Sequence, residues 1–233
     1  VDRLGRLMLR DTERLAELMT LEQGKPLRES RGEITYAASF LTWAAGEGVR
    51  LRGDILPAPA GDKRVLAVRQ AVGVCGIITP WNFPSAMITR KIGPALACGC
   101  TVVIKPSELT PLSALAIGEL ALEAGIPPGV LNIVPGFGET AGQALGRHDD
   151  VDAVAFTGST EIGKRFLVYA GESNMKRVSA ETGGKTPNII FADAPDLDFA
   201  IGAIGFSIFW NTGEMCIAGS RLMVERPIYD DVV

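Results

Sequence analysis

The chain has 233 residues, and its 23 Lys and Arg against 27 Asp and Glu give a net charge of −4 with the single His neutral. This mild acidity argues against nucleic acid or an anionic membrane as partner, because both attract a basic surface. Hydrophobic residues make up 47% of the chain, which excludes a disordered protein. No apolar run approaches the roughly 20 residues that span a bilayer. Four Cys in a chain of this length indicate no disulfide scaffold, so we expect a reducing compartment, the cytoplasm.

The first 50 residues predict two amphipathic helices on either side of a breaker at residues 24–26. The apolar residues that define their two faces are Leu4, Leu7, Leu15 and Leu18 on the first, and Ile34, Ala37, Ala38 and Leu41 on the second. A turn-rich stretch with two prolines follows at residues 50–63, and a β-like run at residues 64–72.

From residue 72 onwards, apolar strands alternate with helices. Strands are predicted at 72–79, 101–105, 130–134, 153–157 and 176–180, and helices at 84–97, 111–124, 140–146 and 160–170. This alternation is typical of βαβ units in a mostly parallel, doubly wound, Rossmann-like α/β sheet. A second α/β unit begins near residue 183, with a strand at 187–191 and a helix at 197–210.

The residues that follow each strand are the first candidates for a site, because ligands of such sheets bind at the carboxyl ends of the strands. Lys105 follows the second strand, and Glu108 stands three residues further on. The Lys could bind ribose hydroxyls or phosphate, and the Glu could accept both hydroxyls of an adenosine ribose and repel a 2′-phosphate. The alternative is an exposed Lys–Glu pair at a helix start.

Gly158 and Ser159 precede the helix predicted at 160–170. Ser159 is first of all a helix cap, but the same backbone amides could hold a pyrophosphate. There is no GxGxxG motif, and the glycines at 136, 138 and 142 are weak evidence that also fits a tight turn.

Cys216 is the candidate nucleophile, since it lies in a polar, Gly-containing loop after an apolar helix. Cys75, Cys98 and Cys100 lie in or beside predicted strands and are interpreted as buried small hydrophobic residues. No His or second Cys pair stands near them, so no metal site is predicted.

Glu181 follows the fifth strand and could be a general base if burial raises its pKa; the alternative is a solvent-facing carboxylate. His148 lies in a charged loop without a catalytic partner and is interpreted as a surface residue.

Six segments, in order and correctly spaced, together resemble the aldehyde dehydrogenase superfamily. They are ITPWNFP (78–84), GPALACGCTVVIKPSELTP (93–111), AGIPPGVLNIVPGFG (124–138), FTGSTEIGK (156–164), ETGGKTPNIIFADA (181–194) and GEMCIAGSR (213–221). The stretch from residue 33 to 74 and the run SAMITRKIGPALA are most similar to the succinate-semialdehyde dehydrogenase branch.

The resemblance implies oxidation of an aldehyde to a carboxylic acid with NAD, or with NADP. Cys216 matches the nucleophile that forms a thiohemiacetal and then a thioester. Asn82 matches the oxyanion-binding side chain, helped by the Cys216 backbone N–H. Glu181 matches the base that activates water. The implied cofactor-binding residues are Thr79, Pro80, Trp81, Lys105, Ser107, Glu108, Gly138, Phe156, Gly158, Ser159, Thr182 and Gly183, and Glu108 favours NAD over NADP.

Three positions depart from the family pattern or bear on the substrate. Glu214 stands where Gln is usual, and its charge would raise the thiol pKa of Cys216 unless the side chain points away. Trp210 stands where succinate-semialdehyde enzymes usually have an Arg, which favours a neutral, aromatic or cationic aldehyde. Arg90 matches the branch's other carboxylate-binding Arg. The substrate is thus succinate semialdehyde, an aminoaldehyde or an aromatic aldehyde.

Family members run to roughly twice this length, so the resemblance implies a fragment that lacks the first strands and most of the catalytic domain. The implied domains are 1–182 for NAD binding, with 51–72 as part of an oligomerisation arm, and 183–233 as the start of the catalytic domain. We expect a homo-oligomer for the longer protein. The competing hypothesis is a dinucleotide-binding fragment without catalytic activity.

Overall fold

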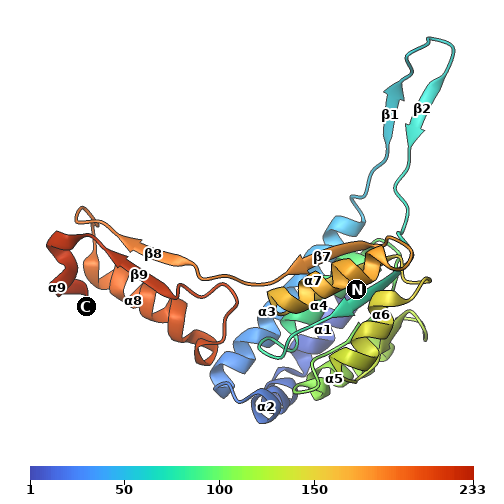
Figure 1. The fold of residues 1–233 in the computed structure, drawn as a ribbon. Coiled ribbons are helices and arrows are strands. Elements are labelled where there is room, and N and C mark those ends of the chain that lie inside the picture. The colour runs from blue at the N-terminus through green and yellow to red at the C-terminus, as the bar shows by residue number, and fades with distance from the viewer.

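A computed structural model describes residues 1–233, and it has a main body, a projecting hairpin and a smaller unit at the C-terminal end (Figure 1). The main body holds a five-stranded, fully parallel sheet in the order β5-β4-β3-β6-β7. The strands are β3 (Val74–Ile78), β4 (Thr101–Lys105), β5 (Leu131–Ile133), β6 (Ala153–Thr157) and β7 (Arg177–Glu181). The predicted doubly wound α/β sheet is confirmed, and its strand order changes direction beside β3.

The connecting helices lie on both faces of the sheet. They are α4 (Ala86–Ala97), α5 (Pro111–Glu123), α6 (Gln143–Arg147) and α7 (Thr160–Gly171). The helix predicted at 140–146 is wrong in its type and start, because a π-helical turn occupies Gly138–Gly142 before α6 begins. The last strand is also shifted by one residue, so that Glu181 ends β7 instead of following it.

Three helices, not the predicted two, precede the sheet. They are α1 (Asp2–Arg10), α2 (Thr12–Gln23) and α3 (Leu27–Gly48). The apolar pattern continues across the break at Asp11, which is why the sequence gives no sign of it. Gly24 ends α2 in the left-handed conformation (φ 94°), as a glycine beyond a helix end commonly does.

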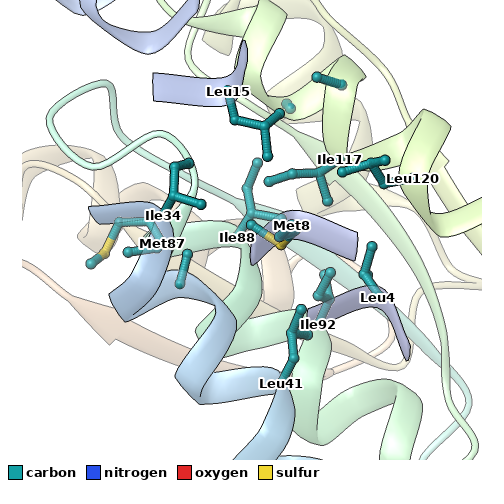
Figure 2. Close-up of a cluster of buried hydrophobic side chains, with 14 of the residues drawn as sticks. Leu4, Met8, Leu15, Ile34, Leu41, Met87, Ile88, Ile92, Ile117 and Leu120 are labelled. Atoms are coloured by element: carbon teal, nitrogen blue, oxygen red, sulfur yellow. The ribbon is translucent and has the colours of Figure 1, made fainter. Parts of the chain in front are cut away.

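The main core lies between these helices and one face of the sheet (Figure 2). Ten labelled members come from α1 to α5: Leu4, Met8, Leu15, Ile34, Leu41, Met87, Ile88, Ile92, Ile117 and Leu120. A smaller cluster, which includes Phe156 and Phe166, lies under α7. Burial of each such side chain contributes about 1.5–3 kcal/mol, so this packing fixes the sheet on which the site is built.

A two-stranded antiparallel hairpin, β1 (Asp54–Pro57) and β2 (Arg64–Ala67), projects from the body (Figure 1). Every residue of both strands is exposed. The stretch at 50–63, predicted to be rich in turns, also contains a strand, β1, that is not predicted. The predicted β-like run at 64–72 shortens to β2.

The C-terminal unit is a single βαβ element, with β8 (Pro187–Ile190) parallel to β9 (Arg221–Val224) and α8 (Leu197–Phe209) between them. A short turn at Trp210–Gly213 (η2) follows α8. A second turn at Arg226–Ile228 (η3) follows β9 and leads into α9 (Tyr229–Val232). The helix α8 has no buried residue. No helix in the chain combines the length and apolarity needed to cross a membrane.

Candidate active site

The carboxyl ends of β3, β4, β6 and β7 meet at one edge of the sheet, and two pockets open there. The first has a volume of about 420 Å³, and the second of about 500 Å³. Residues that line both are Pro80, Trp81, Thr157, Gly158 and Ser159. Because the pockets share this wall, groups bound in one lie next to groups bound in the other.

The first pocket brings together ten of the twelve predicted cofactor-binding residues. They are Thr79, Pro80, Trp81, Lys105, Ser107, Glu108, Gly138, Phe156, Gly158 and Ser159. The remaining two, Thr182 and Gly183, line the second pocket. Residues of five different strand ends and loops therefore converge as the sequence predicts.

Lys105 and Glu108 form an ion pair on the wall of the first pocket. Lys105 Nζ lies 2.9 Å from Glu108 Oε2, with the Lys side chain buried and the Glu side chain exposed. The hydrogen bond from Lys105 lowers the pKa of Glu108, so the carboxylate stays ionised at neutral pH. The alternative interpretation, an exposed Lys–Glu pair, holds for Glu108 only, because Lys105 is buried.

Ser159 caps α7, because its hydroxyl oxygen accepts a hydrogen bond from the Ile162 N–H at 3.2 Å. The preceding Gly158 has no room for a side chain, since a Cβ there would come within 2.6 Å of the Phe156 ring. The backbone at the start of α7 is therefore not covered by a side chain at position 158. Its N–H groups can bind an anion in the pocket.

Thr79, at the end of β3, is a further polar group on this wall. It is buried, and its Oγ1 has no hydrogen-bond partner within the protein. Buried hydroxyl groups are nearly always satisfied, so this oxygen is available to a bound molecule.

Cys216 lines the second pocket and is half-buried. The chain at residues 183–184 lies directly against it, and the Gly184 N–H donates to the Cys216 carbonyl at 3.1 Å. Gly183 has φ +68°, and a Cβ there would lie 3.3 Å from the Cys216 Cβ. A glycine at 183 lets the end of β7 approach the thiol this closely.

Asn82 lines the same pocket. Its Nδ2 donates to the backbone carbonyl of Glu214 at 2.6 Å. Its Oδ1 is buried and has no partner. An amide nitrogen carries two hydrogens, so one N–H remains for a ligand in the pocket.

Glu181 lies at the edge of this site and does not line either pocket. Its side chain is exposed, and its Oε1 accepts a hydrogen bond from the Gly183 N–H at 2.7 Å. The carboxylate is therefore solvent-facing in this conformation, two residues from a glycine that touches Cys216.

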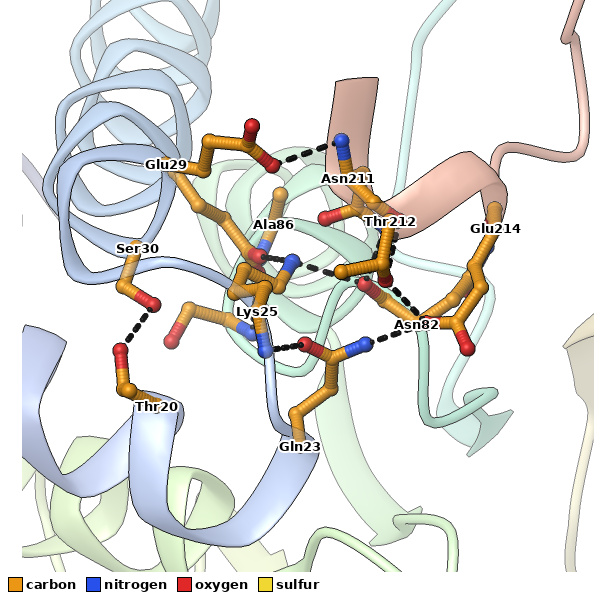
Figure 3. Close-up of polar contacts among 12 residues, drawn as sticks. Thr20, Gln23, Lys25, Glu29, Ser30, Asn82, Ala86, Asn211, Thr212 and Glu214 are labelled. Atoms are coloured by element: carbon orange, nitrogen blue, oxygen red, sulfur yellow. Dashed lines mark hydrogen bonds and ion pairs between the residues drawn. The ribbon is translucent and has the colours of Figure 1, made fainter. Parts of the chain in front are cut away.

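Glu214 is turned toward the N-terminal helices. Its Oε2 accepts hydrogen bonds from Gln23 Nε2 at 2.7 Å and from the Thr212 hydroxyl at 2.9 Å (Figure 3). It does not line the pocket of Cys216.

The two predicted substrate-binding residues lie outside the pocket of Cys216. Arg90 Nη2 donates to the Tyr36 hydroxyl at 2.8 Å, and its guanidinium lies 4.7 Å from the Phe40 ring centroid. It lines a separate hollow of about 730 Å³ at the base of the hairpin. Trp210 packs between two rings, with centroid distances of 5.6 Å to Phe83 and 5.5 Å to Phe206.

Sequence reasoning missed Lys91, which follows Arg90 on α4. Burial lowers the pKa of Lys91 to about 8, with a further lowering by the charge of Arg90 and an opposing influence from Glu181. The electrostatic influence of Glu181 links this Lys to the candidate base. The signal in the sequence was a pair of cations inside an otherwise apolar helix.

The whole chain, residues 1–233, matches the model of the aldehyde dehydrogenase family. The chain belongs to this family. Among its relatives, the mitochondrial succinate-semialdehyde dehydrogenase of Arabidopsis thaliana is 53% identical over 224 residues, which cover 96% of this chain and 42% of that protein. The NADP(+) succinate-semialdehyde dehydrogenase of Escherichia coli is 51% identical, over 96% of this chain and 46% of that protein.

Solved structures agree with this assignment. An NADP-dependent enzyme of E. coli superimposes with a TM-score of 0.96 at 50% identity, over 99% of this chain and 47% of that one. A P. syringae indole-3-acetaldehyde dehydrogenase variant, complexed with NAD+ and IAA, has a TM-score of 0.95 at 51% identity, over the same shares. This chain spans about half the length of the relatives it matches.

Proposed function

We propose that this chain carries the cofactor pocket and the nucleophile of an NAD(P)-dependent aldehyde dehydrogenase. The observation that supports this most directly is the shared wall between the pocket of Cys216 and Asn82 and the pocket of Lys105 and Glu108. Oxidation of an aldehyde through a covalent intermediate requires a thiol and an amide donor beside a pocket with groups that can bind a nucleotide.

The residues of the first pocket fit a dinucleotide. Lys105 and Glu108 present a donor and an acceptor for ribose hydroxyls, the bare backbone at Gly158 and Ser159 suits a pyrophosphate, and the unpartnered Thr79 hydroxyl offers one more bond. The ionised Glu108 would repel a 2′-phosphate, which favours NAD over NADP. When bound, NAD(P)+ supplies the hydride acceptor that converts a thiohemiacetal on Cys216 into a thioester.

The chemistry of the chain's own residues begins with Cys216. Its thiolate attacks the carbonyl carbon of the aldehyde, and the carbonyl oxygen takes up the negative charge. The free N–H of Asn82 and the backbone N–H of Cys216 stabilise this oxyanion. After the thioester forms, Glu181 takes a proton from a water molecule whose oxygen bonds to the acyl carbon. The C–S bond then breaks, so the carboxylic acid leaves and Cys216 returns to the thiolate.

The position of Glu181 sets a condition on the last step. Its carboxylate now binds the Gly183 N–H, so it must rotate away from this N–H to reach a water near Cys216. A side-chain rotation of an exposed residue is fast, on the picosecond to nanosecond scale, and does not limit turnover.

The substrate we propose is a carboxylate-bearing semialdehyde such as succinate semialdehyde, given the high identity to two succinate-semialdehyde dehydrogenases. A second candidate, an aromatic aldehyde, is favoured by the identity to an indole-3-acetaldehyde dehydrogenase. Trp210 is consistent with it as an aromatic residue at the start of the turn that leads to Cys216, although it does not line the pocket. An aminoaldehyde would also find a cation–π partner in such a ring.

We further propose that residues 1–182 are the cofactor-binding domain and 183–233 the beginning of the catalytic domain. The exposed strand edges of β1 and β2 suit pairing with another subunit, so we propose a homo-oligomer.

The test is NADH formation at 340 nm by the purified chain, with succinate semialdehyde, an aminoaldehyde and an aromatic aldehyde, each with NAD and with NADP. We expect turnover with at least one aldehyde and a faster rate with NAD. A folded chain that binds NAD but turns over no aldehyde would instead support a dinucleotide-binding unit without catalytic activity.

A further inference from the structure

Lys25 is a charged side chain completely removed from solvent. Its exposed fraction is 0%, as is that of its ion-pair partner Glu33. The ammonium also lies 4.3 Å from the centroid of the Phe83 ring. Desolvation of two charges offsets most of what their attraction contributes, and apolar residues of equal volume often serve stability as well. Stability alone does not account for a pair buried in this way.

The remaining hydrogen bonds of the two side chains all go to the backbone of one five-residue segment, 82–86. Lys25 Nζ donates to the backbone carbonyl of Asn82 at 2.8 Å. Glu33 Oε1 accepts from the backbone N–H of Ser85 at 2.9 Å and of Ala86 at 3.1 Å. The ion pair therefore fixes the path of the chain from Asn82 to the first turn of α4.

Asn82 in turn is bound at both ends by the loop that carries Cys216. Asn211 Nδ2 donates to the Asn82 carbonyl at 3.0 Å, and Asn82 Nδ2 donates to the Glu214 carbonyl at 2.6 Å (Figure 3). The carbonyl of Asn82 is thus shared between Lys25 and the nucleophile loop.

This loop has a conformation that needs outside support. Asn211, Thr212 and Gly213 all lie in the left-handed region, with φ of 55°, 55° and 80°. Non-glycine residues persist there only where their surroundings hold them. Part of this support comes from the same N-terminal helices, because Glu29 Oε2 accepts a hydrogen bond from the Asn211 N–H at 2.7 Å.

We propose that Lys25 is a positioning residue, which acts through the Asn82 carbonyl to fix the Asn82 amide and the Cys216 loop relative to each other. The inference rests on the proposed function, since it assigns Lys25 a role in placing the oxyanion donor against the nucleophile. Lys25 touches neither pocket, so it takes no part in the chemistry itself.

The variant that isolates this contact is Lys25→Met combined with Glu33→Gln. It removes both buried charges together, and the Gln oxygen still accepts from Ser85 and Ala86. The matched control is Arg31→Met, since Arg31 on α3 pairs with Glu13 on α2 at 2.7 Å, close to the Lys25 connection in sequence but at the surface. Circular dichroism checks that each variant is folded.

We expect kcat for NADH formation to fall about tenfold to a hundredfold in the Lys25 variant, because displacements of about 1 Å have costs of this size. KM for the aldehyde should change less than twofold, and Arg31→Met should change neither. When Lys25→Met and Glu33→Gln are added to a chain that already carries Asn82→Ala, kcat should fall by less than a further twofold. The proposal is overturned if the two changes lower kcat equally with Asn82 and with Ala at position 82. It is also overturned if the folded variant keeps the kcat of the parent chain.

Hydrogen exchange gives an answer that does not depend on turnover. The Lys25 variant should lose protection in peptides that cover 82–86 and 211–216, while peptides from α5 stay unchanged. If the parent chain forms no NADH with any aldehyde, the proposed function fails, and the exchange result alone decides the role of Lys25. Unchanged exchange in both segments then overturns it.

Discussion

The side-chain amide of Asn82 donates a hydrogen bond to the backbone carbonyl of Glu214 at 2.6 Å, across 132 residues of sequence. This bond joins the end of β3 to the loop that carries Cys216, two residues further on. A bound aldehyde oxygen would share the same amide, which has a second N–H available. The bond therefore places the donor near the thiol before any substrate arrives, and such prearrangement is a large part of electrostatic catalysis.

Replacement of Cys216 by Ala should abolish aldehyde oxidation and leave NAD binding near normal, because the thiol contributes the nucleophile but no wall of the first pocket. NADH formation at 340 nm and a fluorescence titration with NAD measure the two properties, in this chain or in a longer protein that contains it. The control is Cys98→Ala, since Cys98 lies outside both pockets. The interpretation of Cys98 as a buried residue is wrong, because it is exposed just beyond the end of α4. Undiminished turnover in Cys216→Ala would remove the assignment of the nucleophile.

Replacement of Glu108 by Ala should narrow the preference for NAD over NADP by about tenfold, which corresponds to about 1.4 kcal/mol. The reason is the loss of an ionised carboxylate that would face a 2′-phosphate. The measurement is the ratio of kcat/KM for the two cofactors. Glu139→Ala is the matched control, because Glu139 is an exposed carboxylate on the wall of the same pocket. A ratio that moves equally in both variants would count against Glu108 as the ribose ligand.

The parallel sheet could be predicted because its strands are short apolar runs that end in polar loops, as at Ile78 and Lys105. The break at Asp11 and the strand β1 could not. The first lies within one continuous apolar pattern. The second is an exposed strand whose four residues acquire their conformation only by pairing with β2.

The site divides in the same way. Cys216 could be proposed from the polar, Gly-containing composition of its loop, and Asn82 from the resemblance of its segment to the family. Lys25 and Gln23 could not, since they stand beside the breaker at Gly24 and resemble surface residues. Gln23 meets Glu214 across 191 residues of sequence, and no local pattern encodes a contact of this range.

Ile88 on α4 tests the core that supports the site. Its exposed fraction is 0%, and it packs among the helices of Figure 2. Ile88→Ala should lower the free energy of unfolding by about 2–5 kcal/mol, through lost burial and the cavity left behind. Urea denaturation measures this value. Leu21→Ala, at a position that is 85% exposed, should change it by about 0.5 kcal/mol or less.

Lys91 should make stability depend on pH in the alkaline range. Its pKa is about 8 in the folded chain against an ordinary value of 10.5. Below pH 8 both states carry the proton, and the folded state bears the cost of a buried charge. Between pH 8 and 10.5 the folded state releases the proton first, so the contribution of Lys91 to stability rises with pH.

The variant Lys91→Met lacks this dependence. The free energy of unfolding of the parent chain minus that of Lys91→Met should therefore be larger at pH 9.5 than at pH 7. Urea denaturation at the two pH values gives this difference, and other titrating groups cancel because both proteins contain them. A difference that is independent of pH would show that Lys91 has its ordinary pKa.

A substitution at Trp210 tests which of the two proposed substrate classes the site accepts. Its ring is held between Phe83 and Phe206 at the start of the turn that leads to Cys216. Trp210→Arg would replace this aromatic surface by a cation, which pairs with a substrate carboxylate. The measured quantity is kcat/KM for succinate semialdehyde divided by kcat/KM for an aromatic aldehyde. If the pocket is built for aromatic aldehydes, Trp210→Arg should raise this ratio at least about tenfold, or by about 1.4 kcal/mol.

The matched control for this change is Trp43→Arg, since Trp43 is 70% exposed on α3, whereas Trp210 stands at the start of the turn that leads to Cys216. It should leave the ratio within twofold. A parent chain that already prefers succinate semialdehyde, together with an unchanged ratio in Trp210→Arg, would mean that the carboxylate is bound without residue 210. Arg90 would then be the cation to test, although it must first release the Tyr36 hydroxyl that it now binds.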